Sequence, residues 1–203
     1  VVKYGQSINL GCFRIEFIKT NHSIQDAAAL ALFSPAGIVV HTGDFKVDYT
    51  PVFGDAIDLQ RFGEIGKKGV LALLCESTNA ERSGFTPSEK TVGRVFDNLF
   101  SEYSDTRIII ATFASNVDRV QQIINSAHKY GRKVVVEGRS MVNVIATASE
   151  LGYLNIPENT LIEVDQLKNY PDEQTVLITT GSQGESMAAL SRMANGTHRK
   201  ISI

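Results

Sequence analysis

The second half of the 203-residue sequence alternates apolar, β-branched runs with helix-like segments, and this alternation limits the fold more than any other feature. Strand-like runs occupy residues 107–113, 133–138 and 174–180, and helix-like segments at residues 115–131 and 140–153 follow the first two of them. Crossover helices of this length place the strands that they connect parallel in one sheet. The pattern therefore predicts an α/β fold with a parallel sheet and helices on its faces.

Two of the expected helices carry clear signals. Thr86, Pro87 and Glu89 form a capping-box pattern, which predicts that a helix begins there. Residues 115–131 carry an apolar stripe at helical spacing and end at a glycine. We expect this stripe to face the core; its members are Val117, Val120, Ile123, Ile124 and Ala127.

The first half of the sequence predicts a mixed order of elements. Residues 13–20 alternate like a strand, and residues 26–33 ("DAAALALF") favour a helix because alanine and leucine are strong helix formers. Residues 37–45 form a β-branched strand. Residues 57–69 predict a polar helix closed by glycine, and residues 70–78 predict a continuously apolar strand buried on both faces.

Composition narrows the class of protein. With 43% hydrophobic and 21% charged residues the chain is an ordinary globular sequence, and its net charge of −2 gives no overall attraction for nucleic acid. Cys12 and Cys75 lack metal-binding or disulfide spacing, so we expect a reducing, cytoplasmic setting. No apolar run approaches the roughly 18 to 20 residues that span a bilayer, so no membrane segment is predicted.

His22 and Asp44 each follow an expected strand and precede a polar loop. A fold that brings these strand ends together presents an imidazole and a carboxylate to one point, and both groups are good zinc ligands. Two ligands do not make a site, however. The spacing alone favours His22 beside a helix cap and Asp44 as a turn former.

Other polar residues lie at expected strand ends. Glu76 follows an apolar strand, where a carboxylate either organises a site or caps the next loop. Arg139 leaves a strand toward a helix start and can grip a phosphate or form an ordinary salt bridge. The glycine-rich turn at residues 180–185 can point N–H groups at a phosphate, although such turns are often only turns.

Several stretches together resemble the metallo-β-lactamase/β-CASP ribonucleases, and most closely the ribonuclease J family. They are "TNHSIQDAAAL", "HTGDFKVD", "ESTNAE", "ATFASNVDRVQQII", "GRSM" and "TGSQGESMAALSRMANGTHR". The resemblance implies part of a metallo-β-lactamase αββα lobe at residues 1–78. It implies a β-CASP lobe with a parallel, Rossmann-like sheet at residues 79–203, truncated at its C-terminal side.

The resemblance implies a zinc-dependent 5′-to-3′ exonuclease and endonuclease of RNA decay and ribosomal RNA maturation. His22 and Asp44 would ligate zinc, with Asp44 bridging two ions, and Asp44 and Glu76 would be catalytic. RNA phosphates would be held by Arg139, Ser140, Ser182 and Gln183. The family also implies RNA as partner, a homo-oligomer or a hetero-oligomer with a paralogue, and no membrane.

The sequence differs from the family because it lacks several of the expected histidine motifs. The His-x-His-x-Asp-His motif and the later histidine motifs do not occur in it, and both ends begin or stop within strand-like runs. We therefore expect a segment of a longer protein that is inactive alone. The alternative is a non-catalytic, RNA-holding or partner-binding lobe. Hydrolysis of a thioester or lactam is disfavoured, because small substrates need no β-CASP cap.

Overall fold

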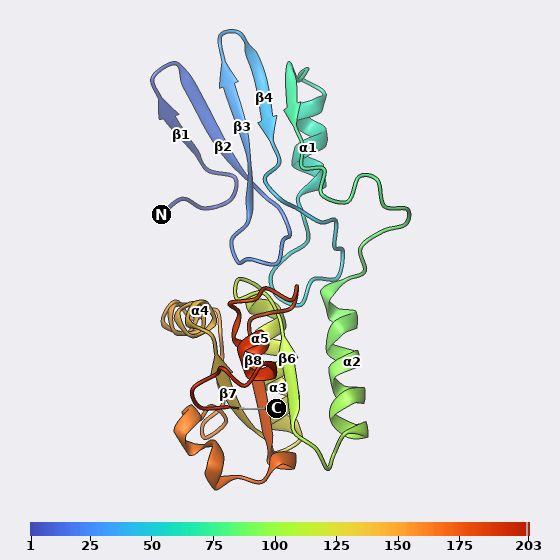
Figure 1. The fold of residues 1–203 in the computed structure, drawn as a ribbon. Helices are drawn as coiled ribbons and strands as arrows, with labels where there is room; N and C mark the ends of the chain where they lie inside the picture. The colour runs from blue at the N-terminus through green and yellow to red at the C-terminus, as the bar shows by residue number, and fades with distance from the viewer. Residues whose placement is uncertain (202) are drawn as a thin grey trace. The chain divides into compact units, whose positions relative to one another are not determined.

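The computed structural model describes residues 1–201 and 203, and it divides into two compact units, Val1–Lys90 and Thr91–Ile203 (Figure 1). Each unit has its own sheet and its own apolar core. Within the described residues, none of the helices has the length and apolar content needed to cross a bilayer. The boundary predicted between residues 78 and 79 stays a prediction.

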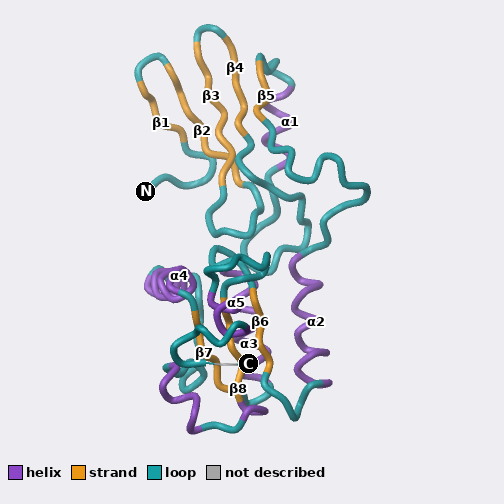
Figure 2. Tube along the Cα trace, viewed as in Figure 1, coloured by secondary structure: helices purple, strands orange, loops and turns teal. Residues whose placement is uncertain are grey.

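The first unit is built on a five-stranded sheet (Figure 2). Its strands in spatial order are β1 (Ser7–Leu10), β2 (Phe13–Lys19), β3 (Ala28–Ser34), β4 (Gly37–His41) and β5 (Ala72–Leu74). Neighbours from β1 to β4 are antiparallel, and β5 runs parallel to β4. Helix α1 (Leu59–Gly66), capped by the Asp58 side chain, covers one face through Ile65 and Phe62.

The helix predicted at residues 26–33 is wrong, because residues 28–34 form strand β3. This strand pairs with β2 on one side and β4 on the other, so its N–H and C=O groups are used between strands. Ala29 and Ala31 are completely buried, where their small side chains let α1 approach the sheet. Tertiary pairing has overridden the helix propensity of alanine and leucine.

The strand predicted at residues 70–78 is shorter and more exposed than expected. β5 has three residues and, among the described strands, pairs only with β4. Leu71 and Leu73 are 66% and 61% exposed. The prediction of burial on both faces is therefore wrong for these residues, because β5 is an edge strand and only one of its sides has a neighbour.

The second unit has a parallel three-stranded sheet, which confirms the predicted α/β class. Strand β8 (Thr175–Thr179) lies between β6 (Ile108–Ala111) and β7 (Lys133–Glu137), and all five of its residues are buried. The other elements are α2 (Glu89–Glu102), α3 (Val117–Lys129), α4 (Arg139–Glu150), α5 (Ala189–Ala194) and two short 3₁₀ helices at Val164–Asn169 and Asp172–Gln174.

Alternate residues of β8 face two different apolar clusters. Val176 and Ile178 pack with α3 and α4, whereas Leu177 packs with α5 and the first 3₁₀ helix. The predicted apolar stripe of α3 is buried as expected, and the helix stops before Gly131, whose φ is 67°. Helices therefore cover both faces of the sheet, and the strand ends remain open to the loops that carry polar side chains.

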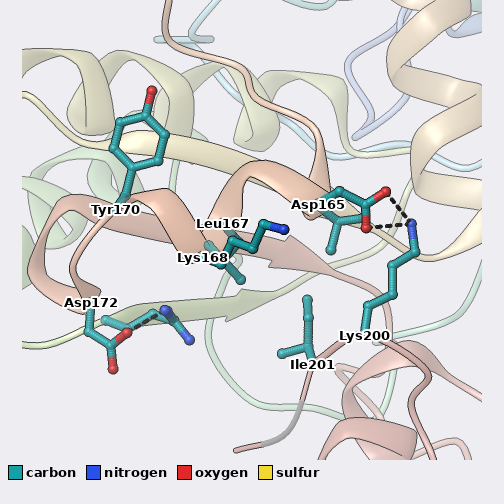
Figure 3. A pocket seen from close by; sticks show the side chains of 9 residues that line it. Asp165, Leu167, Lys168, Tyr170, Asp172, Lys200 and Ile201 are labelled. Atoms are coloured by element: carbon teal, nitrogen blue, oxygen red, sulfur yellow. Dashed lines mark hydrogen bonds and ion pairs between the residues drawn. The ribbon is translucent and has the colours of Figure 1, made fainter.

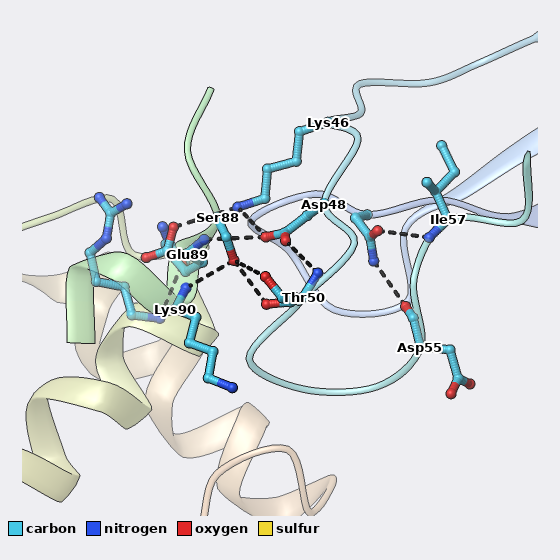
Figure 4. Close-up of polar contacts among 11 residues, drawn as sticks. Lys46, Asp48, Thr50, Asp55, Ile57, Ser88, Glu89 and Lys90 are labelled. Atoms are coloured by element: carbon cyan, nitrogen blue, oxygen red, sulfur yellow. Dashed lines mark hydrogen bonds and ion pairs between the residues drawn. The ribbon is translucent and has the colours of Figure 1, made fainter. Parts of the chain in front are cut away.

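The predicted capping box at Thr86 does not form the start of α2, which begins at Glu89. The backbone N–H of Glu89 instead donates to the Asp48 carboxylate at 3.2 Å, and the N–H of Lys90 donates to the Ser88 hydroxyl at 3.3 Å (Figure 4). Asp48 comes from a loop 41 residues earlier in the chain. A cap supplied from so far away is invisible to local sequence patterns.

Candidate functional site

The structure brings His22 and Asp44 together. They lie in the loops that follow β2 and β4, and His22 Nε2 is 4.0 Å from Asp44 Oδ2. The side chains are 36% and 74% exposed, so solvent and ions can reach both. The pair therefore has the placement that was expected from the two strand ends.

A buried asparagine fixes these two loops to one another. Asn21 Nδ2 donates to the Asp55 carbonyl at 3.0 Å, and Asn21 Oδ1 accepts the Ile57 N–H at 2.8 Å (Figure 4). The N–H of Lys46 donates to the Asn21 carbonyl at 2.8 Å. Because His22 directly follows Asn21 and Asp44 lies two residues before Lys46, these bonds hold the two side chains on neighbouring loops.

Below this network, the side chain of Asp48 is almost fully buried and ties residues 46–50 to residues 88–89. Burial alone would raise the pKa of Asp48. That pKa is instead held below its ordinary value by hydrogen bonds and by the charge of Lys46. The hydrogen bonds come from the Thr50 N–H, the Ser88 hydroxyl and the Glu89 N–H. Asp48 therefore stays ionised, and the loop that carries Asp44 is anchored near its far end.

Tight backbone turns shape the loop before Asp44. Gly43 has a φ of 61°, and a Cβ there would lie 3.3 Å from the Ala28 carbonyl oxygen. The Gly43 N–H donates to His41 Nδ1 at 3.0 Å. His41 is exposed at the end of β4, and its ring nitrogen accepts this bond within the turn.

Glu76 lies at the same sheet edge, after β5. Its N–H donates to the Thr42 hydroxyl at 3.2 Å, and the Thr42 N–H donates to the Leu74 carbonyl at 3.0 Å. The Glu76 carboxylate accepts the Thr78 N–H at 2.7 Å and so caps the next loop. The strand before it is exposed rather than buried, which removes the expected cost of placing a carboxylate there.

The donor chemistry of His22 and Asp44 fits zinc, but the number of donors does not complete a site. Catalytic zinc is held by roughly three protein ligands and structural zinc by roughly four. Within the described residues, no group of three or more His, Cys, Asp or Glu side chains is placed to hold a metal ion. Among the described residues, His22 and Asp44 alone are thus too few to complete a metal site.

The second unit carries a cavity of about 480 Å³ at the carboxyl ends of β7 and β8. Its lining includes Gly138, Arg139 and Ser140 at the start of α4, with Thr180 after β8 and Arg192 on α5. Among the described residues, no side chain caps the N-terminus of α4, so its first N–H groups remain available. Together these features suit an anion.

Two glycines are needed for this cavity. Gly138 has a φ of 104°, and a Cβ there would lie 2.7 Å from the Thr180 hydroxyl oxygen. Gly181 has a φ of 118°, and its Cβ would lie 2.9 Å from the Cβ of Leu190. Only glycine allows both the left-handed backbone and the close approach of these loops.

The four predicted phosphate-binding residues fall into two groups. Arg139 and Ser140 line the cavity, whereas Ser182 and Gln183 lie on an exposed turn outside its lining. The Gln183 N–H donates to the Glu185 carboxylate at 3.2 Å, and the Gly184 N–H closes the turn on the Gly181 carbonyl. Sequence reasoning missed Arg192, because nothing local showed which side of α5 faces the strand ends.

A different cavity, of about 560 Å³, lies at the opposite edge of the same sheet (Figure 3). Two of the three cations that line it are neutralised, and Lys168 is the third. Arg107 pairs with Asp172, and Lys200 lies 3.0 Å from Asp165. Paired charges of this kind offer little net attraction for a ligand, so this cavity is a weaker candidate than the one beside Arg139.

Comparison with known proteins is consistent with these features. Residues 105–203 match the family model described as the β-CASP domain of ribonuclease J. The chain is 48% identical over 203 residues to ribonuclease J from Synechocystis sp., covering 100% of this chain and 31% of that protein. It is 50% identical over 196 residues to ribonuclease J from Helicobacter pylori, covering 97% and 28%.

The ribonuclease J of Mycobacterium tuberculosis is 47% identical over 202 residues, covering 100% of this chain and 36% of that protein. The chain thus spans 28–36% of the length of these relatives. A crystal structure of a protein of unknown function from Enterococcus faecalis has a TM-score of 0.62 at 17% identity, covering 90% of this chain and 45% of that one, which shows likeness of fold alone. The predicted resemblance to the β-CASP ribonucleases, most closely ribonuclease J, is confirmed.

Proposed function

We propose that this chain is a segment of a ribonuclease that hydrolyses RNA phosphodiesters, because residues 105–203 match the family model for the β-CASP domain of ribonuclease J. The observation that carries the proposal is the approach of His22 to Asp44 on two loops that Asn21 holds together. An imidazole and a carboxylate that meet at exposed strand ends are a divalent-metal half-site. The chain is 47–50% identical to each of three ribonucleases J from different bacteria, which supports the same chemistry here.

Zinc is the proposed cofactor, with two ions in the complete site. His22 and Asp44 would be two of its ligands, and a zinc ion held there would supply hydroxide near neutral pH. Glu76 is proposed to hold the loop beside Asp44 in place, since its carboxylate and its N–H are both bonded within that edge. The described residues do not complete this site, so the remaining ligands must come from elsewhere.

Arg139 and Ser140 are proposed to bind an RNA phosphate. The guanidinium can donate two parallel hydrogen bonds to phosphate oxygens, and the open N-terminus of α4 adds N–H donors and a favourable dipole. Ser182 and Gln183 would contact RNA from the exposed turn beside this cavity. These contacts position a substrate and do not by themselves break a bond.

The finer assignments follow from the likeness to ribonuclease J. We propose both 5′-to-3′ exonuclease and endonuclease activity, a role in RNA decay and ribosomal RNA maturation, and assembly as a homo-oligomer or with a paralogue. A cytoplasmic setting is supported by the two free, exposed cysteines. With only half a metal site, the chain by itself is expected to be inactive.

A chimera tests the proposed activity. This chain replaces the matching segment of the Synechocystis ribonuclease J, to which it is 48% identical, and cleavage of a labelled RNA is followed. We expect the chimera to cleave RNA and His22→Ala or Asp44→Ala to lower the rate by at least roughly 100-fold, because even outer-shell partners of metals contribute about 10- to 100-fold. Asp55→Ala, which removes an exposed carboxylate from the same unit, is the matched control and should change the rate little.

The alternative is a lobe that holds RNA without taking part in catalysis. The observation in its favour is that the cavity beside Arg139 is formed within the described residues, whereas the metal site is only half present. This alternative predicts that a chimera with both His22 and Asp44 replaced by alanine cleaves RNA as fast as the unaltered chimera. Circular dichroism shows whether the altered protein is folded.

The chain alone gives a second test of the enzyme proposal. Isothermal titration with zinc should show weak binding, and the chain should not cleave RNA at rates above background. Tight, stoichiometric zinc together with robust cleavage by the isolated 203 residues would overturn the half-site.

A further inference from the structure

We propose that Arg192 is a second phosphate-binding residue of the cavity beside Arg139, and that His198 and Glu137 form a pair that holds Arg192 in position. The inference rests on the proposed function in one respect, that the anion in this cavity is a phosphate of RNA. It adds a ligand-binding residue and two positioning residues that local sequence patterns do not reveal.

The charge of the cavity favours an anion. The described residues that line it include two arginines, Arg139 and Arg192, and no carboxylate. At the opposite edge of the sheet, by contrast, each of two carboxylates already holds a lysine or arginine. A pair of guanidinium groups without a facing acid raises the local concentration of anions and favours groups with several oxygens.

The surroundings of Arg192 leave its guanidinium available to a ligand. Its Nε is shielded from solvent and has no hydrogen-bond partner among the described residues. No acceptor among the described residues is bonded to this nitrogen, so it does not tie the guanidinium to a competing carbonyl or carboxylate. Arginine suits this role because its planar fork can donate two bonds to phosphate oxygens.

The backbone after α5 fixes where Arg192 lies. The Arg192 carbonyl accepts the N–H of Thr197 at 2.8 Å and the N–H of His198 at 3.0 Å. Gly196 has a φ of 67°, which is the left-handed turn that ends many helices. The chain therefore folds back under α5 and carries the His198 side chain toward β7.

The His198 ring then contacts β7. Its Nδ1 accepts the N–H of Ile201 at 3.2 Å and of Lys200 at 3.4 Å, so the hydrogen of the neutral ring is on Nε2. Nε2 lies 3.4 Å from a carboxylate oxygen of Glu137, and the two side chains are only 6% and 16% exposed.

Glu137 is the last residue of β7 and lies two positions before Arg139. The path from Arg192 through His198 to Glu137 thus links the segments that carry the two arginines of the cavity. The same contact engages the Glu137 carboxylate away from the cavity, whose lining does not include it. We infer that the pair sets the spacing of the two guanidinium groups.

Binding of phosphate by the 203-residue chain tests this inference. The probes are inorganic phosphate and a short fluorescent RNA made with either a 5′-phosphate or a 5′-hydroxyl, which separates terminal from internal phosphates. Arg192→Gln should weaken RNA binding by about tenfold or more, as expected for a lost charge-assisted bond, and Arg139→Gln should do the same. Arg192→Lys keeps the charge and should lie between Arg192→Gln and the unaltered chain.

The matched control is Arg199→Gln, which removes the same charge from an exposed position seven residues away. Its affinity should stay within about twofold of the unaltered chain, apart from a small electrostatic effect that salt removes. Thermal unfolding of every variant shows that loss of binding is not loss of fold.

A double-mutant cycle tests the positioning role of the pair. His198→Ala should weaken binding when Arg192 is present and have no further effect in the Arg192→Gln background. Glu137→Gln should behave in the same way. Additive losses would instead show that the pair supports the unit in general, and would overturn the positioning role.

The remaining outcomes separate this inference from the proposed function. If Arg139→Gln weakens binding and Arg192→Gln does not, Arg192 is no ligand-binding residue, while the proposed phosphate site stands. If Arg192→Gln and Arg199→Gln have equal effects, the inference fails as well. If neither the chain nor the chimera binds any of the probes, the phosphate site itself is wrong, and the inference falls with it.

Discussion

Replacing Arg61 by methionine should destabilise the first unit, because it leaves a carboxylate buried without its main partner. Glu16, on β2, has a side chain that is 5% exposed, and Arg61 of α1 reaches it with Nε at 2.5 Å and a second nitrogen at 2.9 Å. Arg14 adds a weaker contact at 3.3 Å. Removing one member of a buried ion pair costs about 3–5 kcal/mol, and the remaining Arg14 contact places the expected loss near the lower end of that range.

The pH dependence of this loss is the more specific test. The hydrogen bond from Arg61, opposed by burial and assisted by the charges of Arg61 and Arg14, holds the pKa of Glu16 below its ordinary value. A carboxylate with a lowered pKa contributes stability above its unfolded pKa, and this contribution is lost as the pH falls through the folded pKa. In Arg61→Met, burial becomes the dominant influence, so Glu16 can protonate and the difference from the unaltered chain should shrink in acid.

Hydrogen exchange followed by mass spectrometry measures this effect locally, since peptides from β2 and α1 report on the first unit alone. Arg61→Met should raise exchange in these peptides at pH 7 and leave β8 unchanged. Glu64→Gln removes the exposed partner of the same arginine and should have a much smaller effect. Equal protection in Arg61→Met and the unaltered chain at pH 7 would refute the reasoning.

Two further changes have results that follow from the same structure. Gly138→Ala should weaken phosphate binding and lower the stability of the second unit by about 1–3 kcal/mol, because the new Cβ would meet the Thr180 hydroxyl. Gly152 has a φ of 77° and open space around it. Gly152→Ala is therefore the control in a thermal melt, since it adds only the strain of a positive φ. Asp48→Asn should lower stability by about 1–2 kcal/mol and speed exchange at the start of α2, since the bond from the Glu89 N–H is weakened; unchanged exchange there would contradict this cap. The pKa of Asp48 is held low, so the difference between Asp48→Asn and the unaltered chain should be present at pH 7 and shrink as the pH falls through the folded pKa.

The second unit was largely predictable because its signals are local and repeated. The spacing of apolar residues in α3 and the β-branched run of β8 each predict burial from the local sequence alone. The alternation of strands and helices then leaves few arrangements other than a parallel sheet. The placement of Arg139 at a strand end followed from the same reasoning.

The first unit was less predictable, because its decisive contacts are long-range. Residues 28–34 have helix propensity and become a strand through pairing with β2 and β4. The edge position of β5 depends on strand order, which composition does not encode.

The candidate sites show the same division. His22 and Asp44 were identified by type and by strand-end position, but Asn21, which holds their loops together, is recognised only when its partners Asp55 and Ile57 are seen. Arg192, His198 and Glu137 were not identified together, because helical spacing alone does not show which side of α5 faces the strand ends.

The most direct measurement of the central claim is the metal content of the chimera together with its RNA cleavage rate. We expect the unaltered chimera to hold zinc and cleave RNA, and we expect Asp44→Ala to lower both together while Asp55→Ala lowers neither. An Asp44→Ala chimera that keeps its full zinc content and its full cleavage rate would show that the pair formed by His22 and Asp44 has no part in a metal centre.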